Sequence, residues 1–143
     1  QNDSIGKYIA GAVIKKLKLK NKDLTKIIIT ILGITFKENV SDIRNTRIID
    51  ILQTLEKHPV TTQVYDPYAN KTDVKNEYQF DLFELDELKK SDAIILAVPH
   101  NDFTSQGWKL MTRLLNEEGG IIYDVKSVLD RDKKPRNVDL LRL

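Results

Sequence analysis

Two segments of this sequence are almost entirely apolar, and they limit the possible folds more than any other feature. Residues 26–36 (KIIITILGITF) and 93–98 (AIILAV) are rich in β-branched residues and contain few polar ones. A strand with one face in water alternates apolar and polar residues, so these continuous runs predict strands that are covered on both faces. Sheets covered in this way are mostly parallel and carry helices on their faces.

Helical segments alternate with the predicted strands. Apolar residues at the helical spacing predict an amphipathic helix over 4–19, with Asp3 or Ser4 as its N-cap. Further helices are expected within 45–57, over 85–90 and over 103–115, further strands at 61–65, 78–80 and 121–125, and a loop or frayed helix at 69–77. This alternation predicts an α/β fold: a Rossmann-like, open, mostly parallel sheet with helices on both faces.

Composition and charge exclude several classes of protein. The chain has 143 residues, enough for one compact domain, and its 23 basic and 21 acidic side chains leave a formal net charge of +2. No basic face carries interleaved aromatic residues, so we expect no nucleic acid partner. Without cysteine there is no disulfide and no thiol nucleophile, and two histidines are too few for a histidine-rich metal site. No apolar run reaches the ~20 residues of a membrane helix and no signal peptide is recognised, so we expect a soluble, cytoplasmic protein with no membrane partner.

Ligands of parallel sheets bind beyond the carboxyl ends of the strands, so the loops at 33–46, 66–69, 99–103 and 124–129 are the candidate site. The first loop lacks the G-x-G-x-x-G motif that holds a dinucleotide, because Gly33 stands alone. Lys37 and Arg44 lie in this loop just ahead of a helix, a position that suits a diphosphate. They could equally pair with Glu38 and Asp42 on the surface, and the spacing does not decide between the two.

Three other polar residues follow predicted strands. Asp66 stands where a Rossmann fold places the acid that binds ribose, but it lies more than the usual ~20 residues after Gly33 and precedes a proline, which favours a turn. His100 has no evident carboxylate or serine partner, so a hydrogen-bonding role is favoured over acid–base chemistry. Lys126 adds a cation at the same edge, and Trp108 is expected in the core. No catalytic residue and no metal ligand is predicted, so the chain is expected to bind rather than to react.

Several segments resemble one protein family. Residues 32–46 (LGITFKENVSDIRNT) strongly resemble the G-x-x-[FY]-K-x-[ND]-x-x-D-x-R-x-[ST] segment of the UDP-glucose/GDP-mannose dehydrogenase family. The resemblance continues in order at 64–68 (VYDPY), 91–98 (SDAIILAV), 100–103 (HNDF) and 123–126 (YDVK), and 2–4 (NDS) with the following helix resemble the lead into the central helix of the family. It therefore covers nearly the whole chain, and it looks closest to the branch that acts on UDP-N-acetylhexosamines.

The resemblance implies two Rossmann-like domains joined by a helix, and this chain looks like the second domain. Residues 1–22 would be the end of the central connecting and dimerisation helix, and residues 23–143 the UDP-sugar-binding domain. Such enzymes use NAD to oxidise the C6 alcohol of a UDP-hexosamine or UDP-hexose to a uronate. NAD and the catalytic cysteine would belong mainly to the absent N-terminal domain, so we expect a fragment that is inactive alone. The implied partners are the UDP-sugar, that N-terminal domain and, at full length, a second copy in a homodimer.

The resemblance also implies roles for individual residues. Lys37 would contact the UDP-sugar at its diphosphate, Phe36 would form a wall of the nucleotide site, and Lys126 matches a position where a basic residue contacts the substrate. Arg44 would reach the NAD phosphates across the cleft between the domains, and His100 would make a rim contact at most. The alternatives are a stand-alone Rossmann-like nucleotide-binding or regulatory module without catalysis and a purely structural interaction domain.

Overall fold

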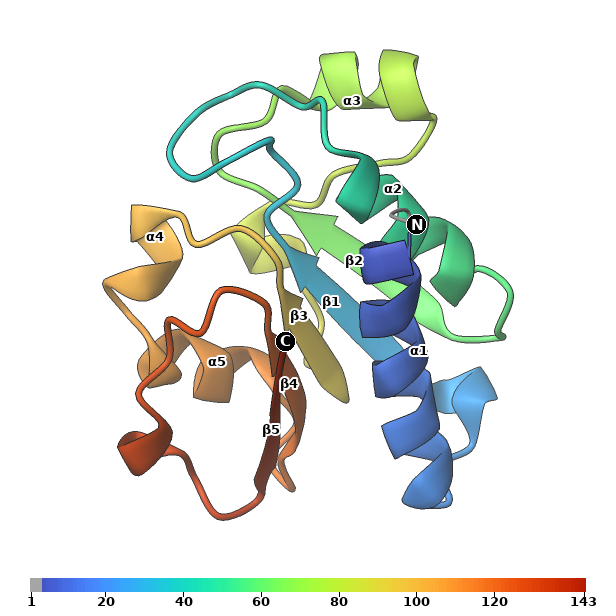
Figure 1. Ribbon diagram of the computed structural model, residues 1–143, viewed down its shortest axis with the longest axis vertical. Coiled ribbons are helices and arrows are strands. Elements are labelled where there is room, and N and C mark those ends of the chain that lie inside the picture. The colour runs from blue at the N-terminus through green and yellow to red at the C-terminus, as the bar shows by residue number, and fades with distance from the viewer. Residues whose placement is uncertain (1–3) are drawn as a thin grey trace.

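The computed structural model describes residues 4–143 and contains one five-stranded sheet with helices on both faces (Figure 1). In chain order the elements are α1 (Ser4–Leu19), the 3-10 helix η1 (Leu24–Lys26), β1 (Ile28–Leu32), α2 (Thr46–Leu55), β2 (Thr61–Tyr65), α3 (Lys71–Tyr78), η2 (Leu85–Glu87), β3 (Ala93–Leu96), α4 (Asn101–Thr104), α5 (Trp108–Leu114), β4 (Gly120–Asp124), η3 (Arg131–Lys133) and β5 (Val138–Arg142). The strand order is β2-β1-β3-β4-β5, and all four pairings are parallel. The predicted fold class is therefore confirmed.

The two faces of the sheet explain why its inner strands read as continuous apolar runs. Successive side chains of a strand point to opposite faces. On β1, Ile29 and Ile31 join a hydrophobic cluster with α1 and α2, whereas on β3, Ile94 and Leu96 join a second cluster with α4 and α5. Figure 1 shows α1 and α2 over one face of the sheet and α4 and α5 on the other side of it. Both faces of β1 and β3 are thus covered, as their composition predicts.

The first helix was predicted at its observed position, and it packs closely on α2. A Cβ added at Gly6 would lie 2.6 Å from the carbonyl oxygen of Arg47, so glycine is needed for the two helices to approach this closely. The expected N-cap falls on Asp3, which lies outside the described residues, or on the side chain of Ser4, which is not described either. None of the helices within residues 4–143 has the length and apolar character that crossing a membrane requires.

Several predicted boundaries were wrong. The strand expected over 26–36 is only Ile28–Leu32, because the backbone turns at Gly33, whose φ is +89°. Those expected over 93–98 and 121–125 are Ala93–Leu96 and Gly120–Asp124. The helix expected over 103–115 is two helices, α4 and α5, because Gly107 adopts a φ of +50° between them.

The chain between β2 and β3 is more helical than expected. Residues 71–78 form a regular helix, because the side chain of Asn70 accepts a hydrogen bond from Asp73 N and caps the first turn. The strand expected at 78–80 is therefore wrong, since Tyr78 ends α3, and the helix expected at 85–90 is only the short turn η2.

The strand β5, at the far edge of the sheet, was not predicted.

Trp108, which was expected in the core, is half-buried against the second cluster, and its Nε1 donates to the carbonyl of Asp130 at 2.7 Å.

Candidate functional site

A cavity lies where the order of the strands predicts a ligand. In the order 2-1-3-4-5 the connections leave β1 and β3 in opposite directions, and ligands bind beyond the carboxyl ends of the strands at this point. A cavity of about 830 Å³ lies there, a volume typical of small-molecule sites. It is lined by residues that follow β1, β3 and β4, by the first turns of α1 and α2 and by the end of α3: Ile5, Gly6, Phe36, Lys37, Glu38, Arg44, Asn45, Thr46, Arg47, Asp50, Tyr78, Ala97, Val98, Pro99 and Lys126. We call it the β1/β3 cavity.

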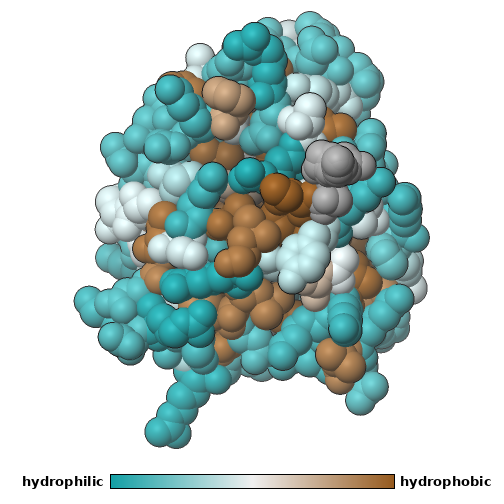
Figure 2. Space-filling model, viewed as in Figure 1, coloured by the Kyte–Doolittle hydropathy of each residue, from teal (hydrophilic) through white to brown (hydrophobic). Residues whose placement is uncertain are grey.

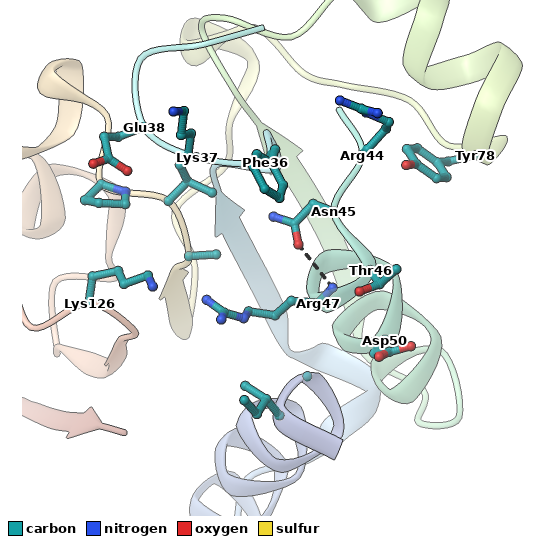
Figure 3. A pocket seen from close by; sticks show the side chains of 15 residues that line it. Phe36, Lys37, Glu38, Arg44, Asn45, Thr46, Arg47, Asp50, Tyr78 and Lys126 are labelled. Atoms are coloured by element: carbon teal, nitrogen blue, oxygen red, sulfur yellow. Dashed lines mark hydrogen bonds between the residues drawn. The ribbon is translucent and has the colours of Figure 1, made fainter. Parts of the chain in front are cut away.

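All four residues that the sequence singled out for ligand binding line this cavity. Phe36, Lys37 and Arg44 come from the loop after β1, and Lys126 follows β4 (Figure 3). The side chain of Phe36 is 61% exposed, which leaves a large apolar ring free at the edge of the cavity. The structure thus brings these residues together as parallel topology predicts, and the ligand roles assigned to them stay predictions.

The charge of the cavity is mostly positive. Lys37, Arg47 and Lys126 line it, and their side chains form no ion pair with any residue within 4–143. In Figure 3 the side chains of Arg47 and Lys126 point toward one another across the cavity. Basic groups that converge in a partly enclosed space without acidic partners attract anions, because low-dielectric walls strengthen their field.

Sequence reasoning missed Arg47, although a signal for it was present. Arg47 lies in the first turn of α2, and its backbone N donates to the side chain of the N-cap residue Asn45 at 3.1 Å. The N-terminus of a helix carries a partial positive charge and favours acidic residues, yet the first turn of α2 contains none. A basic residue in this unfavourable position can be explained by an anionic ligand, which would be stabilised by the side chain and by the helix dipole.

Arg44 occupies the rim of the cavity and is already paired. Its side chain is 87% exposed, and its Nη2 lies 2.6 Å from Oδ2 of Asp42, with a second hydrogen bond of 3.0 Å from Nε to Oδ1. Hydrogen bonds from the side chain and backbone of Arg44 lower the pKa of the Asp42 carboxyl to about 2. The alternative of surface pairing is therefore correct for Arg44 and Asp42. It is wrong for Lys37, which has no ion pair with Glu38.

A buried carboxylate and a buried imidazole lie behind the cavity. His100 Nε2 is 2.9 Å from Asp66 Oδ2, and both side chains have no exposed surface. The prediction that His100 lacks a carboxylate partner was wrong, and the rim contact expected for it is wrong because the ring does not reach the surface. The turn predicted at Asp66 is confirmed, since its Oδ1 accepts hydrogen bonds from the backbone N of Tyr68 and Ala69. Among residues 4–143 no group of three or more histidine, aspartate or glutamate side chains could hold a metal.

Gly33 has a packing role at the end of β1. A Cβ at this residue would lie 2.6 Å from Cβ and 2.9 Å from N of Val98, and its φ of +89° is rare for other residues. Its backbone N donates to the carbonyl of Tyr65 at 2.9 Å. Glycine is therefore needed here so that the end of β1 can approach the segment after β3.

Comparison with known proteins places this geometry in a family context. The model described as "UDP-glucose/GDP-mannose dehydrogenase family, UDP binding domain" matches residues 30–131. The chain is 34% identical over 142 residues to Protein CapL of Staphylococcus aureus, covering 99% of this chain and 33% of CapL. It is 37% identical over 134 residues to the UDP-N-acetyl-D-glucosamine 6-dehydrogenase of Salmonella typhi, covering 92% of this chain and 31% of that protein. The chain thus spans about a third of the length of these relatives.

Solved structures share the fold at lower sequence identity. An NDP-N-acetyl-D-galactosaminuronic acid dehydrogenase from Methanosarcina mazei Go1 superimposes with a TM-score of 0.84 at 19% identity, covering 99% of this chain and 29% of its own. A UDP-D-ManNAc dehydrogenase from Pyrococcus horikoshii gives a TM-score of 0.76 at 22% identity, covering 99% and 31%. At this level of identity the two structures bear on the fold alone.

Proposed function

Because the chain belongs to the UDP-glucose/GDP-mannose dehydrogenase family and matches its UDP binding domain, we propose that it binds the UDP part of a nucleotide sugar in the β1/β3 cavity. The observation that carries this proposal is the set of three basic side chains, Lys37, Arg47 and Lys126, that line the cavity without an ion pair among residues 4–143. A diphosphate would pair with these cations, which outnumber the carboxylates of Glu38 and Asp50 in the lining, and charge-assisted hydrogen bonds to its oxygens are among the stronger polar contacts.

Each cavity residue suits one part of such a ligand. Lys37 carries a compact charge on a flexible stem, and we assign it to the diphosphate together with Arg47, whose planar fork can bind two oxygens at once. Phe36 offers an exposed ring against which a base or ribose can pack. Lys126 faces the cavity from the loop after β4 and is assigned to the substrate. These roles agree with those implied by the resemblance and add Arg47 to them.

We propose further that the whole protein is an NAD-dependent 6-dehydrogenase that converts a UDP-N-acetylhexosamine to its uronate, since one close relative is named a UDP-N-acetyl-D-glucosamine 6-dehydrogenase. The oxidation of the C6 alcohol to a carboxylate would take two steps, in each of which one NAD would accept a hydride from C6, and water would supply the second oxygen; this chain would bind and orient the nucleotide. The main NAD site is assigned to an N-terminal domain outside this chain, because after β1 the place of a glycine-rich loop is taken by Gly33 packed on Val98. Arg44 fits an outer contact with NAD, since its guanidinium is exposed on the rim.

The surface beside α1 supports the two protein partners that we propose, the N-terminal domain and a second copy. Figure 2 shows hydrophobic residues gathered in the middle of the face that carries α1, surrounded by hydrophilic surface. On α1 itself Ile5, Tyr8 and Leu19 are exposed. Apolar side chains that gather on one face are typical of a contact surface. We assign residues 1–22 to the end of the connecting and dimerisation helix and 23–143 to the UDP-sugar-binding domain, and we propose a cytoplasmic location, where nucleotide sugars and NAD are available.

A titration of the chain followed by amide chemical shifts tests this proposal. UDP and UDP-N-acetylglucosamine should shift the amides of 33–46 and 124–129, whereas GDP should shift them little. Replacing Lys37 or Arg47 with alanine should weaken UDP binding roughly ten- to hundredfold, because a hydrogen bond to a charged group contributes about 1.5–3 kcal/mol.

Lys109 provides the matched control. It is exposed on α5, on the opposite face of the sheet, so Lys109→Ala removes the same charge without touching the cavity. UDP shifts confined to other parts of the chain, or equal affinities of Lys37→Ala and Lys109→Ala, would refute the assignment of the cavity.

A further inference from the structure

The segment 34–39, which carries Phe36 and Lys37, has no helix or strand to hold it in place. Its backbone is instead fixed at both ends by buried side chains. At the start, the backbone N of Ile34 and of Thr35 donate to Asp66 Oδ2 at 2.8 and 3.1 Å. At the other end, the backbone N of Asn39 donates to His100 Nδ1 at 2.9 Å. The position of the segment therefore depends on residues that do not line the cavity themselves.

The hydrogen bonds of His100 determine its tautomer. Because Nδ1 accepts the N–H of Asn39, it carries no proton, and the proton of the neutral ring lies on Nε2. Nε2 then donates to Asp66 Oδ2 at 2.9 Å. Thr35 Oγ1 lies 3.2 Å from the same nitrogen and donates its own proton to the carbonyl of Lys37 at 2.9 Å. The carboxylate thus selects the one tautomer in which the ring can accept from the segment, and Thr35 extends the network to Lys37 itself.

Asn39 is held from a second side as well. Its side-chain Oδ1 accepts a hydrogen bond of 2.8 Å from the backbone N of Asn101, at the start of α4. Its φ is +62°, a conformation that asparagine tolerates better than most residues. The rings of Tyr68 and Phe103 pack against the imidazole, with centroids 4.6 and 5.5 Å away. This packing keeps solvent away from the ring, so the hydrogen bonds of His100 are not exchanged for water in the folded chain.

We propose that His100 is a positioning residue of the binding site: as the Nε2–H tautomer selected by Asp66, it holds Asn39 and so keeps segment 34–39, with Lys37, in the conformation that lines the β1/β3 cavity. The part of this inference that concerns ligand affinity rests on the proposed function. The part that concerns the segment does not, and it is measured without ligand.

Two amide substitutions separate the two hydrogen bonds of the ring. In His100→Asn the shorter amide places an oxygen near the former Nδ1, which keeps the acceptor for Asn39 N–H and loses the donor to Asp66. In His100→Gln the longer amide places an NH₂ near the former Nε2, which keeps the donor to Asp66 and loses the acceptor. Both variants remove one buried hydrogen bond and the ring, so a role in stability alone affects them similarly.

The readouts in the 143-residue chain are amide hydrogen exchange and UDP affinity. In His100→Gln we expect exchange of the Asn39 amide to become about tenfold faster, as for the loss of one buried hydrogen bond, and UDP to bind about tenfold more weakly. In His100→Asn both values should stay within about threefold of wild type. The same two substitutions at His58, a half-buried residue after α2, serve as the control and should change neither value.

Two results would overturn the inference. One is an Asn39 amide that exchanges equally fast in both variants. The other needs no variant: ring ¹⁵N shifts of wild-type His100 that place the proton on Nδ1. If either variant fails to fold, the ring ¹⁵N shifts of the wild type decide alone, since a proton on Nε2 supports the inference and a proton on Nδ1 overturns it. If UDP shifts no amide of the wild type while the exchange pattern holds, the proposed function fails and the positioning role stands.

Discussion

Replacing Asp66 with asparagine tests whether one carboxylate joins the loops at the ligand end of the sheet. Asp66 Oδ2 accepts from the backbone N of Ile34 and Thr35 and from His100 Nε2, and Oδ1 accepts from the backbone N of Tyr68 and Ala69. Asparagine has the same shape, but one of its two oxygens becomes an NH₂ group, which only donates. In either orientation of the amide, at least two of the five donors then face another donor.

The cost follows from the smaller of the two losses. A hydrogen bond to a charged acceptor contributes about 1.5–3 kcal/mol, so the orientation that sacrifices Tyr68 N and Ala69 N forfeits two such bonds. Loop relaxation and the removal of a buried charge offset part of this loss. We therefore expect Asp66→Asn to lower the free energy of unfolding by roughly 3–5 kcal/mol, a large share of the 5–15 kcal/mol typical of domains.

Urea denaturation at pH 7 measures this change, with circular dichroism and the fluorescence of Trp108, the single tryptophan, as probes. Asp132→Asn is the control, because the same substitution there affects an exposed carboxylate, and the denaturation midpoint should stay close to wild type. A loss below about 1 kcal/mol for Asp66→Asn, or one equal to that of the control, would refute the reasoning, because two buried hydrogen bonds to a charge cannot contribute so little.

The pH dependence of the same comparison provides a second check. Burial raises the pKa of the Asp66 carboxyl, but the hydrogen bonds from His100, Ile34 and Tyr68 outweigh it and hold the pKa below its usual value. A carboxyl with a lowered pKa in the folded state stabilises the fold above its unfolded pKa of about 3.9, and this contribution is lost as the pH falls through the folded pKa. The difference in the free energy of unfolding between wild type and Asp66→Asn should thus be constant above about pH 5 and become smaller below about pH 4.

Three further results are expected. Gly33→Ala should lower the free energy of unfolding by about 2–4 kcal/mol, because the new Cβ meets Val98 at a positive φ. Gly11 has open space around it, so Gly11→Ala should raise the free energy of unfolding by about 0.5–1 kcal/mol. Thermal denaturation of both variants checks this contrast. Asn45→Ala should cost about 1 kcal/mol through the lost cap of α2, and more if its hydrogen bond to the carbonyl of Thr35 matters, as denaturant midpoints will show. The affinity for UDP should fall as salt is raised, since screening weakens the attraction of the three cavity cations, and an affinity independent of salt would contradict their role.

The layers of the fold were predictable because a strand that is buried on both faces appears in the sequence as a continuous apolar run. β1 and β3 lie inside the sheet and consist almost wholly of apolar residues. β5 has no such run. It is an edge strand that pairs with β4 alone, and because an edge strand is less enclosed than an inner one it can carry the charged residues Asp139 and Arg142. The break between α4 and α5 was hidden for a related reason. The apolar residues on both sides of Gly107 face the same cluster, so their spacing alone suggests one helix.

The cavity residues were predictable for a different reason, which concerns topology rather than local pattern. In a parallel sheet every strand ends at the same edge, so residues that follow strands must gather there whatever the order of the strands. Lys37 and Lys126 were placed correctly by this rule. Arg47 was not, because it lies inside a helix, where the spacing of apolar residues describes only the face toward the core.

The pairing of Asp66 with His100 depends on the strand order, which no local pattern records. The two residues follow β2 and β3, which are not neighbours, because β1 lies between them. The chain after β1 turns away at Gly33, which packs closely on Val98. Asp66, after β2, and His100, after β3, can therefore meet beyond the end of β1. The segments LGITFK, VYDPY and PHNDF are separate in the sequence but are joined by contacts in the structure. Gly33 allows the close approach, Asp66 selects the tautomer of His100, and His100 accepts a hydrogen bond from Asn39. A substitution of Gly33, Asp66 or His100 should therefore change the position of Lys37, although none of these three residues lines the cavity.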